Sequence, residues 1–264
     1  MDKIINSHEI DYKIYGNDLQ YVEVTLDPGE SVIAEAGTMM VMDQFIEMET
    51  IFGDGSAKDQ GLMGSLIGAG KRLLTGAGLF MTMFTNRGHI KQNISFAAPF
   101  PGKILPIDLS ATQNQLLCQK DSFLCAAKGV SVGVAFTRKL GAGFFGGEGF
   151  ILQKLEGDGM TFIHACGGIC KKILKPDEVI KVEAGCIVAM TKDIDYDIEL
   201  VRGIKSMVFG GEGLFFATLR GPGAVLLQSA PLSRLADRLY AATGVTGGSN
   251  QEQSGFLGDL GNLL

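Results

Sequence analysis

The pentapeptide Phe-Gly-Gly-Glu-Gly occurs twice in this chain, at 145–149 and at 209–213. Each copy precedes an apolar run, a Gly-rich turn and a second apolar run. This pattern predicts β-hairpins, because glycine supplies the positive φ that tight turns require. A fainter third copy has Ala77 where the others have glutamate. The predicted strand pairs are 150–155 with 160–165, 214–219 with 224–229, and 79–85 with 89–96. An internally repeated β-protein is therefore the leading interpretation.

A second motif recurs out of phase with the first: Pro-x-Glu, a strand, an Ala-Gly turn and another strand. It begins at Pro28 and again at Pro176, and a degenerate middle copy has Asp121-Ser122 in place of the Ala-Gly turn. The strands predicted from it are 32–35 and 39–42, 116–120 and 123–127, and 179–183 and 187–190. Three modules of roughly seventy residues follow, and such units cannot bury their apolar faces alone. We expect an all-β, pseudo-threefold prism or barrel of stacked antiparallel sheets, built from three internal repeats, with short amphipathic helices.

The predicted body occupies residues 1–232, and the chain changes character after it. Apolar residues then recur at helical spacing, which predicts a short amphipathic helix. They are Leu232, Leu235, Ala236, Leu239 and Tyr240. A polar, Gly-rich linker and an apolar tip, 256–264, complete the predicted C-terminal region 233–264. The tip could bind a partner groove, cap a subunit or be a frayed end.

The net charge and the cysteines indicate which partners and which cellular compartment to expect. The net charge of −6 provides no general field that attracts phosphates, so no nucleic-acid partner is expected. The first residues lack the basic and then apolar order of a secretion signal. The five cysteines include no C-x-x-C pair and lie mostly in apolar runs, as reduced core residues do. A cytoplasmic protein is the expectation.

A metal site is one interpretation of His164, Cys166 and Cys170, which lie close together in the sequence. On an extended strand His164 and Cys166 would share a face, and imidazole and thiolate are ligands that zinc accepts. No second pair at zinc-finger spacing completes a tetrahedron. We therefore predict buried strand residues and no metal.

The segment Gly61–Gly78 is the most distinctive part of the chain outside the repeats. It is not a phosphate-binding P-loop, because five residues separate Gly64 from Gly70 and Arg72 follows Lys71 where Ser or Thr is needed. Its apolar residues recur at helical spacing, which predicts a short amphipathic helix that packs on the body or on a neighbouring subunit. Lys71 and Arg72 argue against a transmembrane span, although the same residues could make weak contact with a membrane surface.

The two repeated glutamates, Glu148 and Glu212, could in principle share acid and base work. A structural role is favoured, because each follows two glycines at the start of a strand, where a carboxylate accepts backbone N–H bonds. The chain has no Gly-x-Ser-x-Gly elbow, and acids alternate with apolar residues over 193–199, which predicts a half-exposed strand with one acidic face. We predict no catalytic, cofactor-binding or metal-binding residues.

The Gly-Ala-Gly-Lys-Arg-Leu-Leu-Thr-Gly run at 68–76, together with the two pentapeptides, resembles the altered-inheritance-of-mitochondria (AIM) twenty-four-like family. The resemblance covers about residues 8 to 232. It implies a fold similar to the tryptophan RNA-binding attenuator protein (TRAP), and it transfers no catalytic residue. A homotrimer is expected from the resemblance and from the projecting segment 61–78.

These observations favour a non-enzymatic oligomeric scaffold or interaction module with an unidentified protein partner. Two alternatives stay open. One is a peripheral membrane organiser that uses Lys71 and Arg72. The other is a hydrolase or isomerase with a carboxylate site in the barrel mouth.

Overall fold

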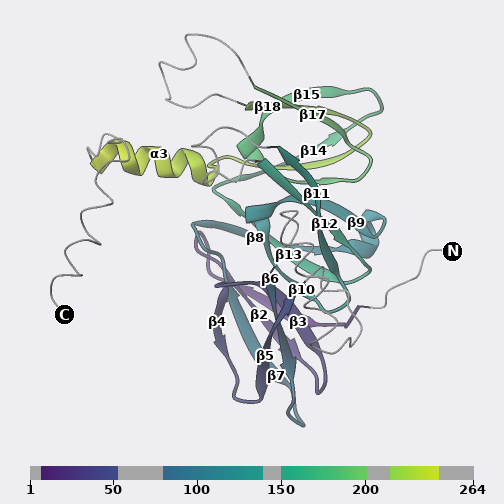
Figure 1. Ribbon diagram of the computed structural model, residues 1–264, viewed down its shortest axis with the longest axis vertical. Coiled ribbons are helices and arrows are strands. Elements are labelled where there is room, and N and C mark those ends of the chain that lie inside the picture. Colours follow the sequence, from purple (N-terminus) through teal and green to yellow (C-terminus); the bar gives the residue numbers. More distant parts are fainter. Residues whose placement is uncertain (1–6, 53–79, 139–149, 201–214, 244–264) are drawn as a thin grey trace, which may run out of the picture. The chain divides into compact units, whose positions relative to one another are not determined.

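The fold consists almost entirely of antiparallel β-strands. A computed structural model describes residues 7–52, 80–138, 150–200 and 215–243. The chain divides into two compact units, Met1–Pro231 and Leu232–Leu264. All the labelled strands belong to the first unit, and helix α3 (Leu232–Thr243) belongs to the second (Figure 1). The predicted all-β class is confirmed, and α3 lies where the helical spacing predicted a helix.

Four sheets contain the strands. The first has the order β1 (Asp11–Tyr15), β2 (Tyr21–Leu26), β7 (Gln92–Ala97), β4 (Met39–Met42). The second has β5 (Ile46–Phe52), β6 (Phe80–Asn86), β3 (Ser31–Glu35), β10 (Phe123–Ala127), β13 (Met160–Cys166), β8 (Gly102–Asp108). The third has β11 (Ser131–Arg138), β12 (Phe150–Glu156), β9 (Gln115–Gln119), β16 (Ile187–Thr191), β19 (Gly223–Gln228), β14 (Ile169–Leu174). The fourth has β15 (Val179–Glu183), β18 (Phe215–Arg220), β17 (Asp195–Leu200).

The predicted hairpins are wrong, although the strands themselves are present. β12 pairs with β9 and β11, whereas β13 pairs with β8 and β10, so the turn between them carries the chain from one sheet to another. The same crossing separates β6 from β7 and β18 from β19. The physical reason is that a Gly-rich turn and alternating apolar residues are equally compatible with a hairpin and with an arch between stacked sheets.

The two six-stranded sheets are assembled in the same way. In the second sheet, the triplet β5-β6-β3 joins the triplet β10-β13-β8 through the pairing of β3 with β10. In the third sheet, β11-β12-β9 joins β16-β19-β14 through the pairing of β9 with β16. The strands at these two joins are rich in buried apolar residues, as strands in the centre of a covered sheet must be.

The two Pro-x-Glu motifs form the same turn. Glu30 Oε2 accepts a hydrogen bond from the Asp27 backbone N–H at 2.8 Å, and Glu178 Oε2 accepts one from the Lys175 N–H at 2.9 Å. The residue before each glutamate has a positive φ, 87° at Gly29 and 63° at Asp177. This recurrence confirms that the short motif specifies one local structure in two places.

The turns that follow β9 and β15 have the same geometry. Lys120–Ser122 and Ala184–Cys186 each form a single 3-10 turn, η2 and η4, between two strands. Lys120-Asp121 thus takes the place of Ala184-Gly185, one position before the predicted Asp121-Ser122, and the threefold repeat stays a prediction.

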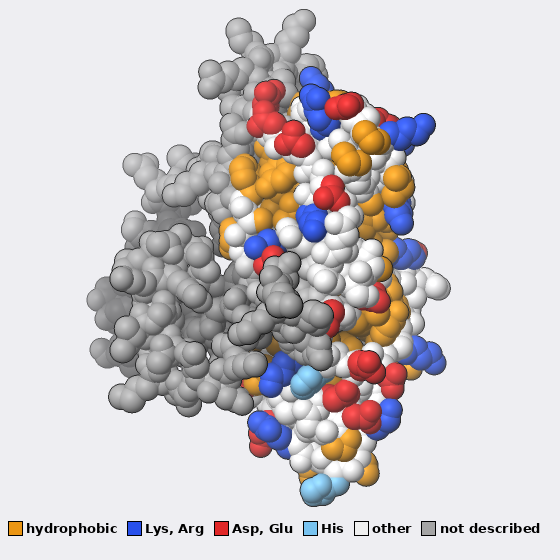
Figure 2. Space-filling view, turned by 90° about the vertical axis from the view of Figure 1, so that its right-hand side faces the viewer, with side chains coloured by type: hydrophobic (Ala, Val, Ile, Leu, Met, Phe, Trp, Pro, Cys, Tyr) orange, Lys and Arg blue, Asp and Glu red, His pale blue; other side chains and the backbone are white. Residues whose placement is uncertain are grey.

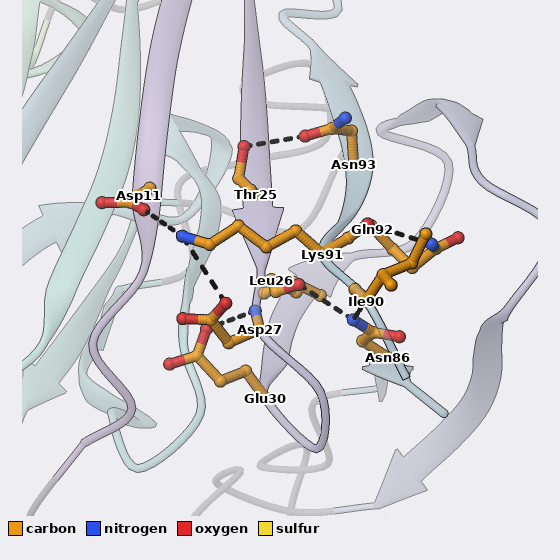
Figure 3. A network of polar contacts seen from close by, with 10 residues as sticks. All are labelled: Asp11, Thr25, Leu26, Asp27, Glu30, Asn86, Ile90, Lys91, Gln92 and Asn93. Atoms are coloured by element: carbon orange, nitrogen blue, oxygen red, sulfur yellow. Dashed lines mark hydrogen bonds and ion pairs between the residues drawn. The ribbon is translucent and has the colours of Figure 1, made fainter. Parts of the chain in front are cut away.

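Asn86 is the buried centre of a polar network at one end of the first sheet (Figure 3). Its Nδ2 donates to the carbonyl oxygens of Leu26 at 2.9 Å and Ile90 at 2.8 Å, and its Oδ1 accepts from the Gly88 N–H. Nearby, Lys91 Nζ lies 3.1 Å from Asp11 Oδ2 and 3.5 Å from Asp27 Oδ1. Asn86 thereby satisfies backbone groups of the turn after β6 and of the last residue of β2.

Candidate interaction surface

Several sheet-end strands of the first unit carry exposed apolar side chains, among them β4 and β15, and also β5 and β14 through Met48 and Ile173. β4 is the last strand of its sheet, and Met40 and Val41 on it are 49% and 56% exposed. β15 is the last strand of its own sheet, and Val179 on it is also exposed. Figure 1 shows the two strands at opposite ends of this unit. We call them the β4 edge (Met39–Met42) and the β15 edge (Val179–Glu183).

Buried counterparts of the β4 edge occur elsewhere in the chain. β4, β10 and β16 each follow a short turn, and each has a break in register with its neighbour at its second residue. That second residue is Met40, Leu124 or Val188. Leu124 and Val188 are completely buried because β3 and β9 respectively pair beside their strands. Met40 stays exposed because none of the described strands pairs with the outer side of β4.

An open groove runs beside the β15 edge. Its volume is about 480 Å³. Cys170 from β14, Val182 from β15, Leu227 from β19 and Cys186 from η4 contribute to its wall. These side chains are apolar or weakly polar, so the groove offers a hydrophobic surface and few hydrogen-bonding groups.

Apolar patches also lie on the face of the molecule shown in Figure 2. Orange side chains gather there in the upper part of the described surface, at the level of β14, β15 and β17 in Figure 1. Red and blue side chains lie above and below them. Apolar patches rimmed by charges are typical of interaction surfaces.

The groove brings together two thiols that are separated in the sequence. Cys170 is exposed, and the Cys186 thiol lies 3.9 Å from Glu183 Oε2. Sequence reasoning singled out Cys170 as a metal candidate but missed Cys186. The available signal was its position in the Ala184–Cys186 turn, which matches the turn before β10.

His164 belongs to the core. It is 2% exposed, and its ring makes an edge-on contact with Phe100 at 4.4 Å between ring centres. Its Nδ1 has no hydrogen-bond partner among the residues that the structure describes. Burial lowers the pKa of His164 to about 4, against the opposing effect of a hydrogen bond with the Asp121 backbone. Cys166 is also buried, and burial raises the pKa of its thiol. Among the described residues, no group of three or more His, Cys, Asp or Glu side chains could hold a metal ion.

The remaining sequence candidates divide into two sets. The acidic strand is confirmed: Ile194 and Ile198 are buried, while Asp195 and Asp197 are exposed. The other candidates lie outside the described residues, and they are Lys71, Arg72, Glu148, Glu212 and the rest of Gly61–Gly78. In the part of the chain that the structure covers, no helix has the length and apolar character needed to cross a bilayer.

Four antiparallel sheets, two of them built from paired strand triplets, define a multi-sheet antiparallel β-protein. The chain belongs to the family described as mitochondrial biogenesis AIM24, whose model matches residues 12–230. The predicted family is therefore confirmed, and the likeness to TRAP stays a prediction.

Two proteins from Streptococcus pyogenes are similar to this chain. An uncharacterised protein of the serotype M6 strain is 29% identical over 221 residues, which is 83% of this chain and 84% of the relative. The crystal structure of another S. pyogenes protein superposes with a TM-score of 0.68 and 23% identity, covering 89% of this chain and all of that one. The second comparison shows that the fold is shared.

Proposed function

We propose that this protein is a non-enzymatic scaffold that associates with itself. The observation that carries the proposal is the pair of open strand edges with exposed apolar side chains, above all Met39-Met40-Val41 on β4. Natural proteins usually protect such edges with lysine, proline or bulges that twist the strand away, since an open edge recruits other strands. The sequence of β4 holds no charge and no proline, and the bulge at Met40 leaves its apolar side chains exposed. Such an edge is suited to being covered by another chain.

The expected assembly is a homotrimer, and the three-module prism belongs to the same proposal. The shared register break in β4, β10 and β16 supports three modules. The β4 and β15 edges differ from each other, which suits a head-to-tail assembly, and closure of such an assembly into a ring leaves neither of these two edges open. A scaffold of this kind would present its outer surface to a further protein partner.

A cytoplasmic location completes the proposal. All five cysteines lie in the described ranges and are thiols, and Cys118, Cys125 and Cys166 are buried. Reduced core cysteines support a reducing compartment. The membrane and enzyme alternatives depend on Lys71, Arg72, Glu148 and Glu212, which the described residues do not include.

Native mass spectrometry of the full-length protein tests the proposal. Spectra over a range of protein concentrations should show a trimer whose mass is three times that of the chain. A monomer at every concentration would overturn self-association. A stoichiometric small molecule retained in the complex would overturn the scaffold in favour of a binding or catalytic protein.

A further inference from the structure

We propose that copies of this chain associate head to tail: β4 of one copy pairs antiparallel with β15 of the next, and Met40 enters the groove beside β15. This inference rests on the proposed self-association and specifies the surfaces that produce it. The occupant of the groove is a second copy of the same chain.

The first argument is that the chain already makes this kind of join twice within itself. β3 pairs with β10, where Ala34 lies opposite Cys125. β9 pairs with β16, where Cys118 lies opposite Ala189. In each join three residues of each strand are matched, in antiparallel register.

The β4 edge and the β15 edge are the two kinds of strand that such a join pairs. β15 corresponds to β3 and β9. All three strands precede a short turn, and each pairs with the central strand of its triplet: β15 with β18, β3 with β6, and β9 with β12. β4 corresponds to β10 and β16 through its register break. β3 and β9 are joined to β10 and β16. Among the strands of the described ranges, this leaves β15 without a strand of the β10 type and β4 without a strand of the β3 type. If the internal register is continued, Val41 lies opposite Val182 and Met42 lies opposite Lys181.

Other sheet edges do not have this complementarity. β5, β11 and β17 end their sheets, and so do β8 and β14. β5, β11 and β17 are sheet ends wherever strands of their type occur. β8 and β14 correspond to β2, whose outer side pairs with β1, a strand of neither the β4 type nor the β15 type. The β4 and β15 edges are distinguished because the chain twice pairs a strand of the β4 type with a strand of the β15 type.

The second argument is the groove. In the first module Val22 lies opposite Phe96, and both belong with Ala34 to the buried cluster that contains Leu124. Leu124, the second residue of β10, therefore fills the space between these side chains when β10 pairs with β3.

The same packing occurs between the second and third sheets. Leu105 lies opposite Ile163, and both pack with Cys118 in the cluster that contains Val188. The incoming residue is again the second residue of its strand, here β16.

The third position in this series is the open groove. Cys170 lies opposite Leu227, and Val182 occupies the place of Ala34 and Cys118. The missing occupant corresponds to Leu124 and Val188, and Met40 is the residue with that position. Methionine is flexible and polarizable, so it suits a groove of irregular shape.

Cysteine cross-linking tests the register. In a background with Cys170→Ala and Cys186→Ala, one protein carries Val41→Cys and a second carries Val182→Cys. The three other native cysteines are buried. Mixing and oxidising the two proteins should give a covalent heterodimer, because residues directly opposite in an antiparallel pair have Cβ atoms about 4.5–5.5 Å apart.

Each protein oxidised alone, and Val41→Cys mixed with Val179→Cys, serve as controls and should give little product. A covalent homodimer of the Val41→Cys protein would show that β4 pairs with itself, which overturns the proposal. Equal yields with Val179→Cys and Val182→Cys would overturn the register.

A matched pair of methionine substitutions tests the groove. Met40→Asp should raise the apparent dissociation constant of the assembly at least about a hundredfold, because a carboxylate would be buried in an apolar groove. Met48→Asp on β5 is the control, since Met48 is also exposed and lies on a sheet-end strand, and it should leave the assembly unchanged. Circular dichroism of both variants should match that of the wild type.

The outcomes separate the two proposals. A monomeric wild type would overturn self-association itself. A wild-type trimer that forms no heterodimer and tolerates Met40→Asp would overturn only the head-to-tail contact. Dissociation of the assembly on deletion of 244–264, with Met40→Asp tolerated, would assign the groove to the C-terminal tail and overturn the proposal.

Discussion

At the scale of single residues, His164 makes the stability of the fold depend on pH. Its pKa is lowered from 6.5 to about 4 by burial, so the unfolded chain binds a proton over a range in which the folded chain does not. Protons therefore favour unfolding, and stability is lost as the pH falls from above 6.5 towards 4. Between pH 7 and pH 5 the loss from this group is about 2 kcal/mol.

The variant His164→Gln isolates that effect. We expect the wild type to lose about 2 kcal/mol more than the variant between pH 7 and pH 5, measured by urea unfolding at each pH. Other titrating groups act equally in both proteins, so they cancel in the difference. An identical pH dependence in the two proteins would show that His164 is protonated in the fold as readily as in the unfolded chain.

Asn86 is the second residue whose environment predicts a large effect. Asn86→Ala removes the side chain that serves two carbonyl groups and the Gly88 N–H, and we expect the free energy of unfolding to fall by about 3 kcal/mol. Asn93→Ala is the control: Asn93 accepts a hydrogen bond from the exposed Thr25 hydroxyl, which water can replace. Chemical unfolding that ranks the two variants equally would contradict the assigned role.

Residue roles were only partly predictable from sequence. The buried nature of Cys166 followed from its apolar surroundings, whereas the meeting of Cys170 with Cys186 did not, because β14 and η4 are brought together by strand pairing across the fold. The internal Pro-x-Glu turns could be predicted because their hydrogen bonds link residues only three positions apart. Contacts between residues that are close in the sequence can be predicted from it, whereas contacts between distant residues cannot.

At the scale of elements, the joins between strand triplets within the six-stranded sheets should contribute strongly to stability. Leu124→Ala should lower the free energy of unfolding by about 2–4 kcal/mol, because Leu124 is fully buried at the join of β3 with β10. Met40→Ala, at the corresponding place on the open β4 edge, should cost less than about 0.5 kcal/mol in a dilute, monomeric sample. Unfolding followed at low protein concentration checks both values, and a large cost for Met40→Ala there would show that Met40 is already covered within one chain.

The strands were predictable and their partners were not. Strands 150–155 and 160–165 appear as β12 and β13, almost at the predicted bounds, because period-two alternation is a local property. Their assignment to different sheets depends on β8, β9, β10 and β11, which lie earlier in the chain. A turn such as Gly157-Asp158-Gly159 contains no information about those distant strands.

At the scale of the whole molecule, the three core clusters explain how the sheets become one unit. The cluster around Leu109 includes Ile33 from β3 and Val188 from β16, and the cluster around Ile198 includes Leu117 and Leu152. Each cluster thus draws on strands from more than one sheet. Cooperative unfolding of the first unit is the consequence, because no sheet retains a complete core without its neighbours.

Removal of the second unit tests whether that core suffices. Every residue of the three clusters precedes Pro231, so a chain of residues 1–231 should fold and unfold in one transition. Its midpoint should lie within about 4 °C of that of the full chain, since about 1 kcal/mol shifts the midpoint of a domain of this size by 2–4 °C. Differential scanning calorimetry at a concentration where both proteins are monomeric makes the comparison. A drop well beyond that range would mean that the residues after Pro231 contribute to the core, and the division of the chain at this point would then be wrong.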